Sequence, residues 1–304
     1  MKLDNILIVV DPTIEKDLVV ERAKMLFAQK KAKVELFINN YFALSNYVQY
    51  PIGADSSFYE KYEADFVEYH LRLLQSLKTE FESLGLSVKT DFRQEKDLAI
   101  AIIDKVSESR PDMVLKSTHS HNWLNRSLIT NTDWRLIRHC AAPLLLVKPI
   151  DWHPHGSVIA SVDPLHNNTE QGKLDHELVS MAEFVAEQFQ QTPRVFHSYQ
   201  PLPSHLLLDG SEYSEVATGI AKLHEQKVDE LLATHGIEPA HVKLASGELV
   251  VELLKFLDDA SGNMLIIGAY SRQGMKRLLV GSSAEEILEN LRCDVLIIKP
   301  HYGN

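Results

Sequence analysis

Three glycines and three basic residues lie close together near the end of the chain. The glycines are Gly268, Gly274 and Gly281, and the basic residues are Arg272, Lys276 and Arg277. Glycine lets a backbone approach a ligand closely and adopt positive φ. Ser282 and Ser283 then open an expected helix, whose first N–H groups and positive dipole end attract anions. These residue types therefore predict a binding site for the phosphate groups of a polyphosphate.

The same residues also have a purely structural interpretation. Ser282 with Glu285, and Ser283 with Glu286, fit a capping box, in which side chains satisfy the first N–H groups of a helix. The glycines could equally be turn residues. From spacing alone, phosphate binding and helix capping both remain open.

A buried strand must position this loop. The second half contains five short apolar runs, at Val158–Val162, Arg194–Ser198, Val242–Ala245, Met264–Ile267 and Val295–Ile298. Amphipathic segments separate these runs, as in the helical spacing of Leu178, Met181, Ala182, Val185 and Phe189. Alternating strands and helices predict a parallel sheet with right-handed crossovers and with helices on both faces.

In such a sheet, ligands bind outside the carboxyl ends of the strands, where the direction of winding reverses. A strand order of 3-2-1-4-5 places this point between the first and the fourth strand. In the second half, Asp163 and Pro164 end the first strand, and Gly268 ends the fourth. We therefore expect an α/β fold in which these residues meet at one crevice.

The two halves of the chain repeat this order of elements. Residues 112–149 align with residues 263–300 without a gap at an offset of 151, and Gly85 matches Gly236 at the same offset. We expect two tandem, doubly wound, open five-stranded parallel sheets, because each half contains one complete set of strands and helices.

The predicted domain boundary lies between residues 1–150 and residues 151–304. The segment between the two units, residues 150–156, contains Pro154 and Gly156, which suit a linker.

Composition limits the classes of function. The chain has 304 residues, of which 45% are apolar, and a net charge of -11, which argues against broad binding to nucleic acid. It contains no apolar run long enough to span a bilayer, and the run before Asp11 is too short for a signal peptide, so we expect a cytoplasmic protein. Cys140 and Cys293 are expected to be buried apolar residues.

The glycine spacing resembles that of the universal stress protein family. ATP-binding members of that family carry a glycine, two residues, a second glycine, nine residues, a third glycine and then Ser or Thr. Gly268 matches the first glycine, and Gly281 with Ser282 matches the last pair at the same spacing. Ser271 stands where the second glycine is expected, and serine is also small. The resemblance extends over nearly the whole chain, twice, which is typical of tandem members with adenine nucleotide alpha-hydrolase-like domains.

This resemblance implies that the second half binds ATP, with or without Mg²⁺. In ATP-binding members, an aspartate at the end of the first strand lies near the adenosine, and Asp163 matches it. The family's second strand lines the adenine, which here indicates the segment Phe196–Ser198. The residues expected to bind the nucleotide are Asp163, Pro164, His197, Ser198, Ile267, Gly268, Ser271, Arg272, Gly274, Gly281, Ser282 and Ser283.

The first half departs from the family pattern. Ser117, Ser120 and Thr130–Asn131 occupy its motif positions, so no glycine remains there. A backbone without glycine cannot wrap phosphates as closely, although Thr130 or Asn131 can still cap the following helix. We expect a degenerate domain that does not bind ATP in the family manner, although Asp11 is retained.

Two further candidate sites have structural alternatives. The aromatic-rich residues 41–59 could bind an apolar small molecule, or could pack on a neighbouring domain or subunit. His119 with His121, and His153 with His155, could face a metal ion as pairs. Because no further ligands at familiar zinc spacing accompany either pair, we expect loop histidines and no metal site.

The chain lacks the motifs of a fast hydrolase. It shows no nucleophile elbow with a Ser-His-Asp order, no Walker loop and no paired-carboxylate motif. Asp163 could hold magnesium or orient a water molecule, which would give slow hydrolysis at most. The leading hypothesis is an ATP-binding regulator whose role in stress survival the resemblance implies. The alternatives are a slow ATPase or nucleotide-dependent transferase, and a carrier or scaffold that binds an apolar metabolite in its first half.

The resemblance also implies a mode of assembly. Single-domain members of the family resemble dimers built along the fifth strand. Leu144–Lys148 and Val295–Lys299 could make that contact within one chain, and the resulting pseudo-dimer could pair again as a homodimer.

Overall fold

The computed structural model describes most of the chain as two compact units. The described residues are 3–14, 17–28, 30–41, 56–118, 129–165, 169–201, 203, 210–269 and 282–300. The N-terminal unit comprises residues 2–118 and 130–149, and the C-terminal unit comprises residues 150–304 together with residues 1 and 119–129. Each unit is described by itself below.

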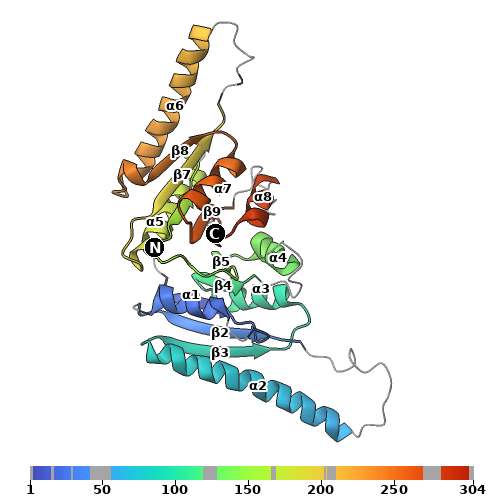
Figure 1. Cartoon of the computed structure of the whole chain (residues 1–304). Helices are drawn as coiled ribbons and strands as arrows, with labels where there is room; N and C mark the ends of the chain where they lie inside the picture. Colours follow the sequence, from blue (N-terminus) through green and yellow to red (C-terminus); the bar gives the residue numbers. More distant parts are fainter. Residues whose placement is uncertain are drawn as a thin grey trace. The chain divides into compact units, whose positions relative to one another are not determined.

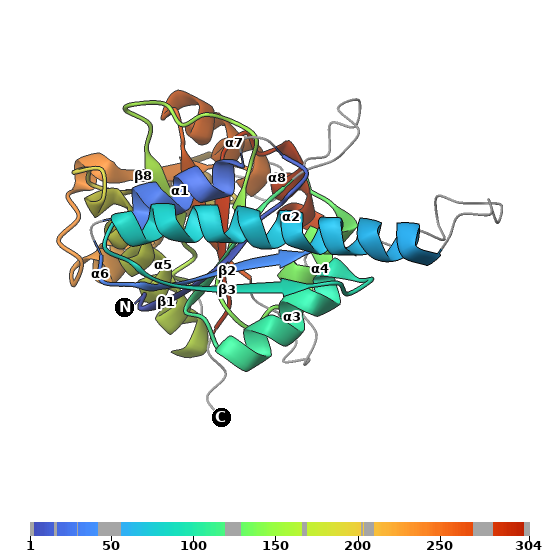
Figure 2. The same cartoon turned by 90° about the horizontal axis from the view of Figure 1, so that it is seen from below.

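The N-terminal unit is a five-stranded parallel sheet with helices on both faces. Its elements are β1 (Asn5–Val9), α1 (Leu18–Phe27), β2 (Lys33–Asn39), α2 (Ser56–Ser83), β3 (Ser87–Arg93), α3 (Leu98–Ser109), β4 (Met113–Ser117), α4 (Asn131–His139) and β5 (Leu144–Val147). The strand order is β3-β2-β1-β4-β5. Helices α1 and α2 cover one face, and α3 and α4 cover the other (Figure 1, Figure 2).

The C-terminal unit repeats this arrangement. Its elements are β6 (Val158–Ser161), α5 (Thr169–Glu187), β7 (Arg194–Tyr199), α6 (Gly210–Leu232), a 3-10 helix (Pro239–His241), β8 (Val242–Ser246), α7 (Leu249–Asp259), β9 (Met264–Gly268), α8 (Ser282–Asn290) and β10 (Asp294–Ile298). The strand order is β8-β7-β6-β9-β10, and each neighbouring pair of strands is parallel. The predicted order 3-2-1-4-5 is therefore confirmed in both units.

Continuous apolar runs form the central strands because both faces of each sheet are covered by helices. Ile6, Leu7 and Ile8 of β1 are at most 1% exposed, and Val158, Ile159 and Ala160 of β6 are at most 2% exposed. Residues of α5 that recur at helical spacing, such as Leu178 and Met181, are buried against this sheet. The predicted strands of the second half are confirmed to within one residue at each end.

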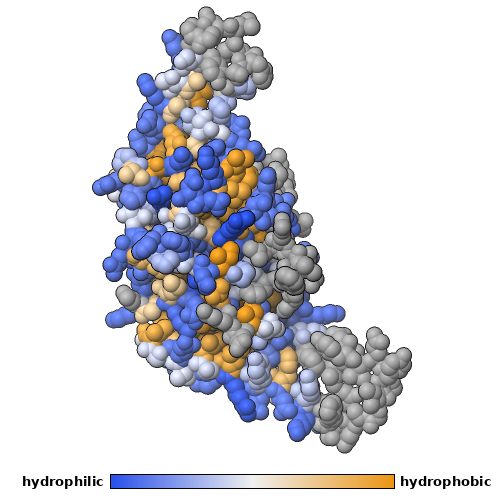
Figure 3. All heavy atoms as spheres, in the orientation of Figure 1, coloured by the Kyte–Doolittle hydropathy of each residue, from blue (hydrophilic) through white to orange (hydrophobic). Residues whose placement is uncertain are grey.

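The two longest helices end at matching glycines. Gly85 follows α2 with φ of 82°, and Gly236 follows α6 with φ of 65°, a conformation that glycine adopts without strain. Val216 and Leu223 of α6 are each 46% exposed, and the surface of this helix mixes apolar and hydrophilic residues on the face drawn in Figure 3. None of the described helices is long and apolar enough to cross a membrane.

The predicted linker is anchored to the C-terminal unit. Trp152 Nε1 donates to Asp294 Oδ2 at 2.7 Å, and the Trp152 ring packs edge-on against Phe189 at 5.1 Å. The backbone N–H of His153 donates to Asn263 Oδ1 at 2.7 Å, and Asn263 Nδ2 donates back to the His153 carbonyl at 2.8 Å. Most of the segment is therefore a fixed part of this unit.

Gly156 is expected to tolerate no side chain, because a Cβ atom there would lie 2.3 Å from Asn263 Oδ1. We predict that Gly156→Ala displaces Asn263 from His153 and lowers the free energy of unfolding of the C-terminal unit by about 1–3 kcal/mol. Urea unfolding followed by circular dichroism measures this change. Gly172→Ala is the matched control, since a Cβ atom at that helical position meets open space. Equal stability of both variants would contradict the anchoring.

Candidate functional site

The register of the C-terminal sheet places part of the predicted site at its carboxyl edge. Ser161, the last residue of β6, pairs with Phe196 of β7 and with Ile267 of β9. The predicted residues that this register gathers at or next to the edge are Asp163, Pro164, His197, Ser198, Ile267 and Gly268.

The rest of the predicted site lies in or next to the loop that precedes α8. Ser271, Arg272, Gly274 and Gly281 lie outside the described residues. Ser282 and Ser283 are the first two residues of α8, as predicted, and their side chains lie outside the description. The structure therefore gives the start of the helix and leaves the loop as a prediction.

A buried carboxyl group, that of Asp175 on α5, lies directly behind Asp163. The backbone N–H of Asp163 donates to Asp175 Oδ1 at 3.1 Å, whereas Asp175 Oδ2 has no hydrogen-bond partner among the described residues. Burial is the main cause that raises the pKa of Asp175 to about 7; the backbone hydrogen bond from Asp163 opposes this effect, and the charge of Asp163 adds to it. Near neutral pH this carboxyl group is therefore partly protonated.

The N-terminal unit has a counterpart with more donors. Asp17 Oδ2 accepts a hydrogen bond from the Asp11 N–H at 3.0 Å, and Oδ1 accepts from the Val19 N–H at 3.1 Å and from the Ser117 hydroxyl. In the sequence repeat, Gly268 takes the place of Ser117. Because glycine has no hydroxyl, the corresponding carboxyl group of the C-terminal unit lacks that donor.

Two histidines meet at the same edge of the C-terminal unit. His197 Nδ1 lies 3.0 Å from the carbonyl oxygen of Val162, and His197 Nε2 lies 2.7 Å from Nδ1 of His224 on α6. The ring of Tyr199 stacks on His224 with 4.5 Å between centroids. Burial lowers the pKa of His224, and so does the charge of His197, while Asp163 acts in the opposite direction.

Helix α4 of the N-terminal unit corresponds to α8, and side chains of the protein form hydrogen bonds at its start. Thr130 and Asp133 form a complete capping box, as expected for Thr130. Asp133 is fully buried, and its Oδ1 pairs with Lys116 Nζ at 2.8 Å. Asp11, the retained aspartate, accepts hydrogen bonds from the N–H and hydroxyl groups of Thr13, which is a local turn role.

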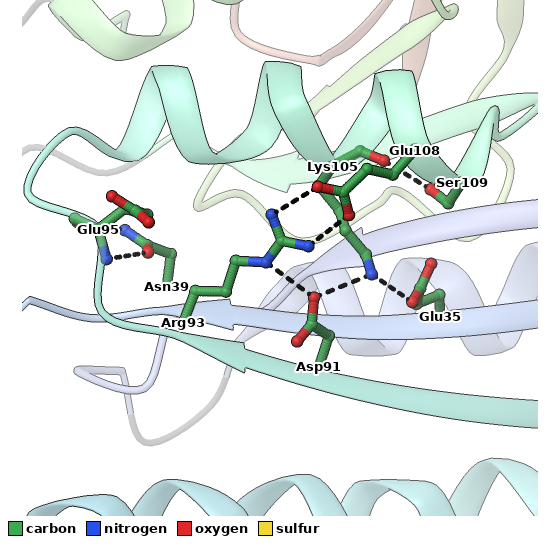
Figure 4. A network of polar contacts seen from close by, with 8 residues as sticks. All are labelled: Glu35, Asn39, Asp91, Arg93, Glu95, Lys105, Glu108 and Ser109. Atoms are coloured by element: carbon green, nitrogen blue, oxygen red, sulfur yellow. Dashed lines mark hydrogen bonds and ion pairs between the residues drawn. The ribbon is translucent and has the colours of Figure 1, made fainter.

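A cavity of about 380 Å³ lies on the N-terminal unit, at the amino ends of β1, β2 and β3. Beside it, Lys105 pairs with Glu35 at 2.6 Å and with Asp91 at 2.9 Å, and Arg93 pairs with Asp91 and Glu108 (Figure 4). Burial lowers the pKa of Lys105, but its hydrogen bonds to the two carboxylates outweigh burial and raise it. Each carboxylate of this network pairs with Lys105 or Arg93, so we interpret the network as a tie between α3 and the sheet.

The remaining predicted sites give no ligand cluster. Within the part of the chain that the structure describes, no group of three His, Cys, Asp or Glu residues could hold a metal ion. His153 and His155 lie side by side with ring centroids 6.3 Å apart, whereas His119 and His121 lie outside the description. Cys140 and Cys293 are buried, as predicted. Of residues 41–59, only Tyr41 has a described side chain, and it is 44% exposed.

Sequence reasoning missed four residues of these sites. Asp175 interrupts an apolar helix face next to Leu174, and this was the only local signal for it. His224 gave none, because it meets His197 across 27 positions of sequence. Two residues carried a recognisable signal: Lys116 is a charged residue inside an apolar strand, and Asp133 stands at the third position after Thr130, as in a capping box. Nothing in the sequence indicated that the two side chains pair with each other.

Comparisons with known proteins agree with the repeated architecture. The sequence profile of the universal stress protein family matches residues 2–148 and 170–299. The universal stress protein E homolog of Haemophilus influenzae is 26% identical over 308 residues, which cover 99% of this chain and 98% of the relative. Universal stress protein E of Escherichia coli is 28% identical over 206 residues, which cover 66% of this chain and 64% of the relative.

Solved structures share the fold over nearly the whole length. A protein of unknown function from Pseudomonas aeruginosa has a TM-score of 0.78 at 21% identity, covering 98% of this chain and 93% of that one. A universal stress protein from Archaeoglobus fulgidus has a TM-score of 0.64 at 13% identity, covering 98% of this chain and 99% of that one. At these identities, the likeness shows the fold alone.

Asp175→Asn is expected to stabilise the C-terminal unit at alkaline pH. The pKa of Asp175 is about 7 in the folded state and 3.8 when the group is unperturbed, as in the unfolded chain. The folded state therefore loses stability relative to the unfolded state as the pH rises from 3.8 to about 7, and the loss is constant above that pH. The difference between these two pKa values corresponds to roughly 4 kcal/mol, which a neutral amide would recover. Urea unfolding at pH 8 and pH 4 measures the difference between variant and parent, which should vanish at pH 4.

Asp17→Asn is the matched comparison for this substitution. Both oxygens of Asp17 already accept hydrogen bonds, so an amide nitrogen there would face a donor and destabilise the N-terminal unit. A gain of stability at Asp17 equal to that at Asp175 would show that burial alone, and not the missing donor, governs the effect.

Lys116→Ile is expected to destabilise the N-terminal unit by about 3–5 kcal/mol, because it leaves the buried carboxylate of Asp133 without its cation. The double variant Lys116→Ile with Asp133→Ala reproduces the residues of the other repeat, Ile267 and Ala284, and should recover much of this loss. Thermal unfolding of the three proteins tests the pairing. A double variant no more stable than the single one would contradict it.

Proposed function

Because the chain belongs to the universal stress protein family, we propose that its C-terminal unit binds an adenine nucleotide as a regulatory ligand. The nucleotide that the sequence indicates is ATP, with or without Mg²⁺. The N-terminal unit binds no ATP in the family manner in this proposal, so one chain holds one nucleotide.

The observation that carries the proposal is the start of α8 at Ser282. This residue directly follows Gly281, the third glycine of the predicted phosphate loop. The first N–H groups of a helix have no partner within the helix, and the helix dipole favours negative charge there. A phosphate group satisfies both requirements, with Arg272 and Lys276 of the preceding loop as sources of positive charge.

The contrast with α4 supports the choice of the C-terminal unit. The capping box satisfies the N–H group of Asp133 in the first turn of α4 and that of Thr130 before it, and Lys116 pairs with the carboxylate. An incoming phosphate group would have to displace this buried ion pair. At the corresponding positions the C-terminal unit has Ile267 and Ala284, which can neither pair nor cap.

The proposed mechanism is conformational. Phosphate groups at the start of α8 would contact residues 269–281 and so alter a surface that a partner protein reads. A slow ATPase is the alternative from another class, and Asp163 is the residue on which it would depend. Turnover that Asp163→Ala abolishes, measured with the purified full-length chain, would favour the ATPase.

The proposed nucleotide site says nothing about the predicted assembly or about a ligand of the first half. Pairing of Leu144–Lys148 with Val295–Lys299, pairing of two chains and an apolar ligand in the N-terminal unit all stay predictions. Mass spectrometry of molecules released from freshly purified protein addresses the ligands, and should detect an adenine nucleotide.

Gly281→Val is expected to weaken ATP binding by roughly tenfold or more, because a branched side chain would enter the space of the phosphate group. Isothermal titration of nucleotide-free, full-length protein with ATP measures the affinity. Gly219→Val is the matched control, since a Cβ atom at that position of α6 meets open space, and it should leave the affinity unchanged. Equal affinity of Gly281→Val and the parent would place the phosphate site elsewhere.

A further inference from the structure

The histidine pair at the carboxyl edge belongs to the C-terminal unit alone among the described residues. The Val162 N–H bonds the Phe196 carbonyl, as the Val10 N–H bonds the Phe37 carbonyl, so the residue that corresponds to His197 is Ile38. His197 is 1% exposed and lies beside Leu244 of the neighbouring strand. An imidazole has therefore replaced an apolar core residue at this edge, and its nitrogens need partners.

The partners of the two rings determine where their hydrogens lie. The carbonyl oxygen of Val162 can only accept, so His197 Nδ1 carries the hydrogen. Neutral His197 then presents a lone pair at Nε2, to which His224 Nδ1 must donate. Neutral His224 in turn has its own lone pair at Nε2, for which no partner exists among the described residues.

The position of His224 makes this nitrogen available to a ligand. Its ring is partly exposed and stacks on Tyr199 at an interplanar angle of 22°. Since Nδ1 faces His197, Nε2 points away from the buried strand. Asp163, the predicted adenosine-side residue, lies near enough to influence the charge of His224.

We propose that His224, with its tautomer set by His197, recognises the amino group at position six of a bound adenine. The free Nε2 accepts a hydrogen bond from that amino group. A purine with an oxygen at position six would place an oxygen lone pair against the lone pair of His224 Nε2, so it binds more weakly. This inference rests on the proposed function and adds base selectivity to it, through a side chain.

Protonation of His224 reverses the selection. With a hydrogen on Nε2, the ring becomes a donor that repels an amino group and favours a six-oxo purine. Two titratable groups on β7, His197 and Tyr199, face His224. Asp163, which follows β6, also faces it, and Asp175 of α5 lies behind Asp163. Leu244 and Ser246 of β8 lie beyond β7 and do not titrate. On α6 itself, Lys227 lies one turn away and pairs with Glu230.

The test compares ATP with inosine triphosphate, which differ at position six of the base. Isothermal titration of the full-length protein at pH 8 should give ATP roughly tenfold to a hundredfold tighter than inosine triphosphate. The ratio should fall as the pH is lowered to 5. In His224→Phe, which keeps an aromatic ring against Tyr199, the ratio should fall to about one at pH 8, while phosphate-dependent binding remains.

His176→Phe is the matched control, because His176 is also hydrogen-bonded to a histidine, His235, but on the exposed side of α5. It should leave the ratio unchanged. Nitrogen-15 spectra of the parent protein add a readout that needs no variant. Nε2 of His224 should show the shift of a bare ring nitrogen at pH 8, and a hydrogen on Nε2 at that pH would overturn the proposal.

The outcomes separate this inference from the proposed function. Binding of both nucleotides with equal affinity, lost in Gly281→Val, would overturn the role of His224 and leave the nucleotide site standing. A preference for ATP that survives in His224→Phe would do the same. Absence of binding of either nucleotide to folded protein would overturn both.

Discussion

One constraint applies to both units: the free N–H groups at the start of a helix need acceptors, whether from the chain or from a ligand. The two units have the same fold, and we propose that they meet this need differently. In the N-terminal unit, Thr130 and Asp133 supply the acceptors, and Lys116 balances the buried charge. The C-terminal unit has apolar Ile267 and Ala284 at the two corresponding positions, together with glycines before the helix. Duplication has thus produced one self-occupied helix start and one that we assign to a ligand.

The same loss of internal partners recurs at the edge of the C-terminal sheet. Asp175 lacks the hydroxyl donor that Ser117 gives to Asp17, because Gly268 stands in its place. His224 ends a chain of hydrogen bonds, and its Nε2 has no partner among the residues that the structure describes. In a folded protein, buried or partly buried polar groups without partners are uncommon and call for an explanation. Asp175 and His224 both lie near Asp163, as a site shaped for a polar ligand would require.

Much of the fold could be predicted from local sequence, and less of the site. Short runs such as Met264–Ile267 indicate buried parallel strands because both faces of the sheet are covered, and the repeat with Gly85 and Gly236 supports two units. Asp163 and Gly268 could be placed at one edge from topology alone. The contacts of Asp175 and His224 could not be predicted, because they depend on how α5 and α6 pack on the sheet. The spacing of apolar residues along a helix does not determine that packing.

The stoichiometry of ATP binding distinguishes the two helix starts. Titration of nucleotide-free, full-length chain should give one ATP per chain, since we propose that phosphate supplies the acceptors at the start of α8 alone. Two equivalents per chain would show that the ion pair of Lys116 and Asp133 yields to phosphate, and would contradict the division of roles between the two units.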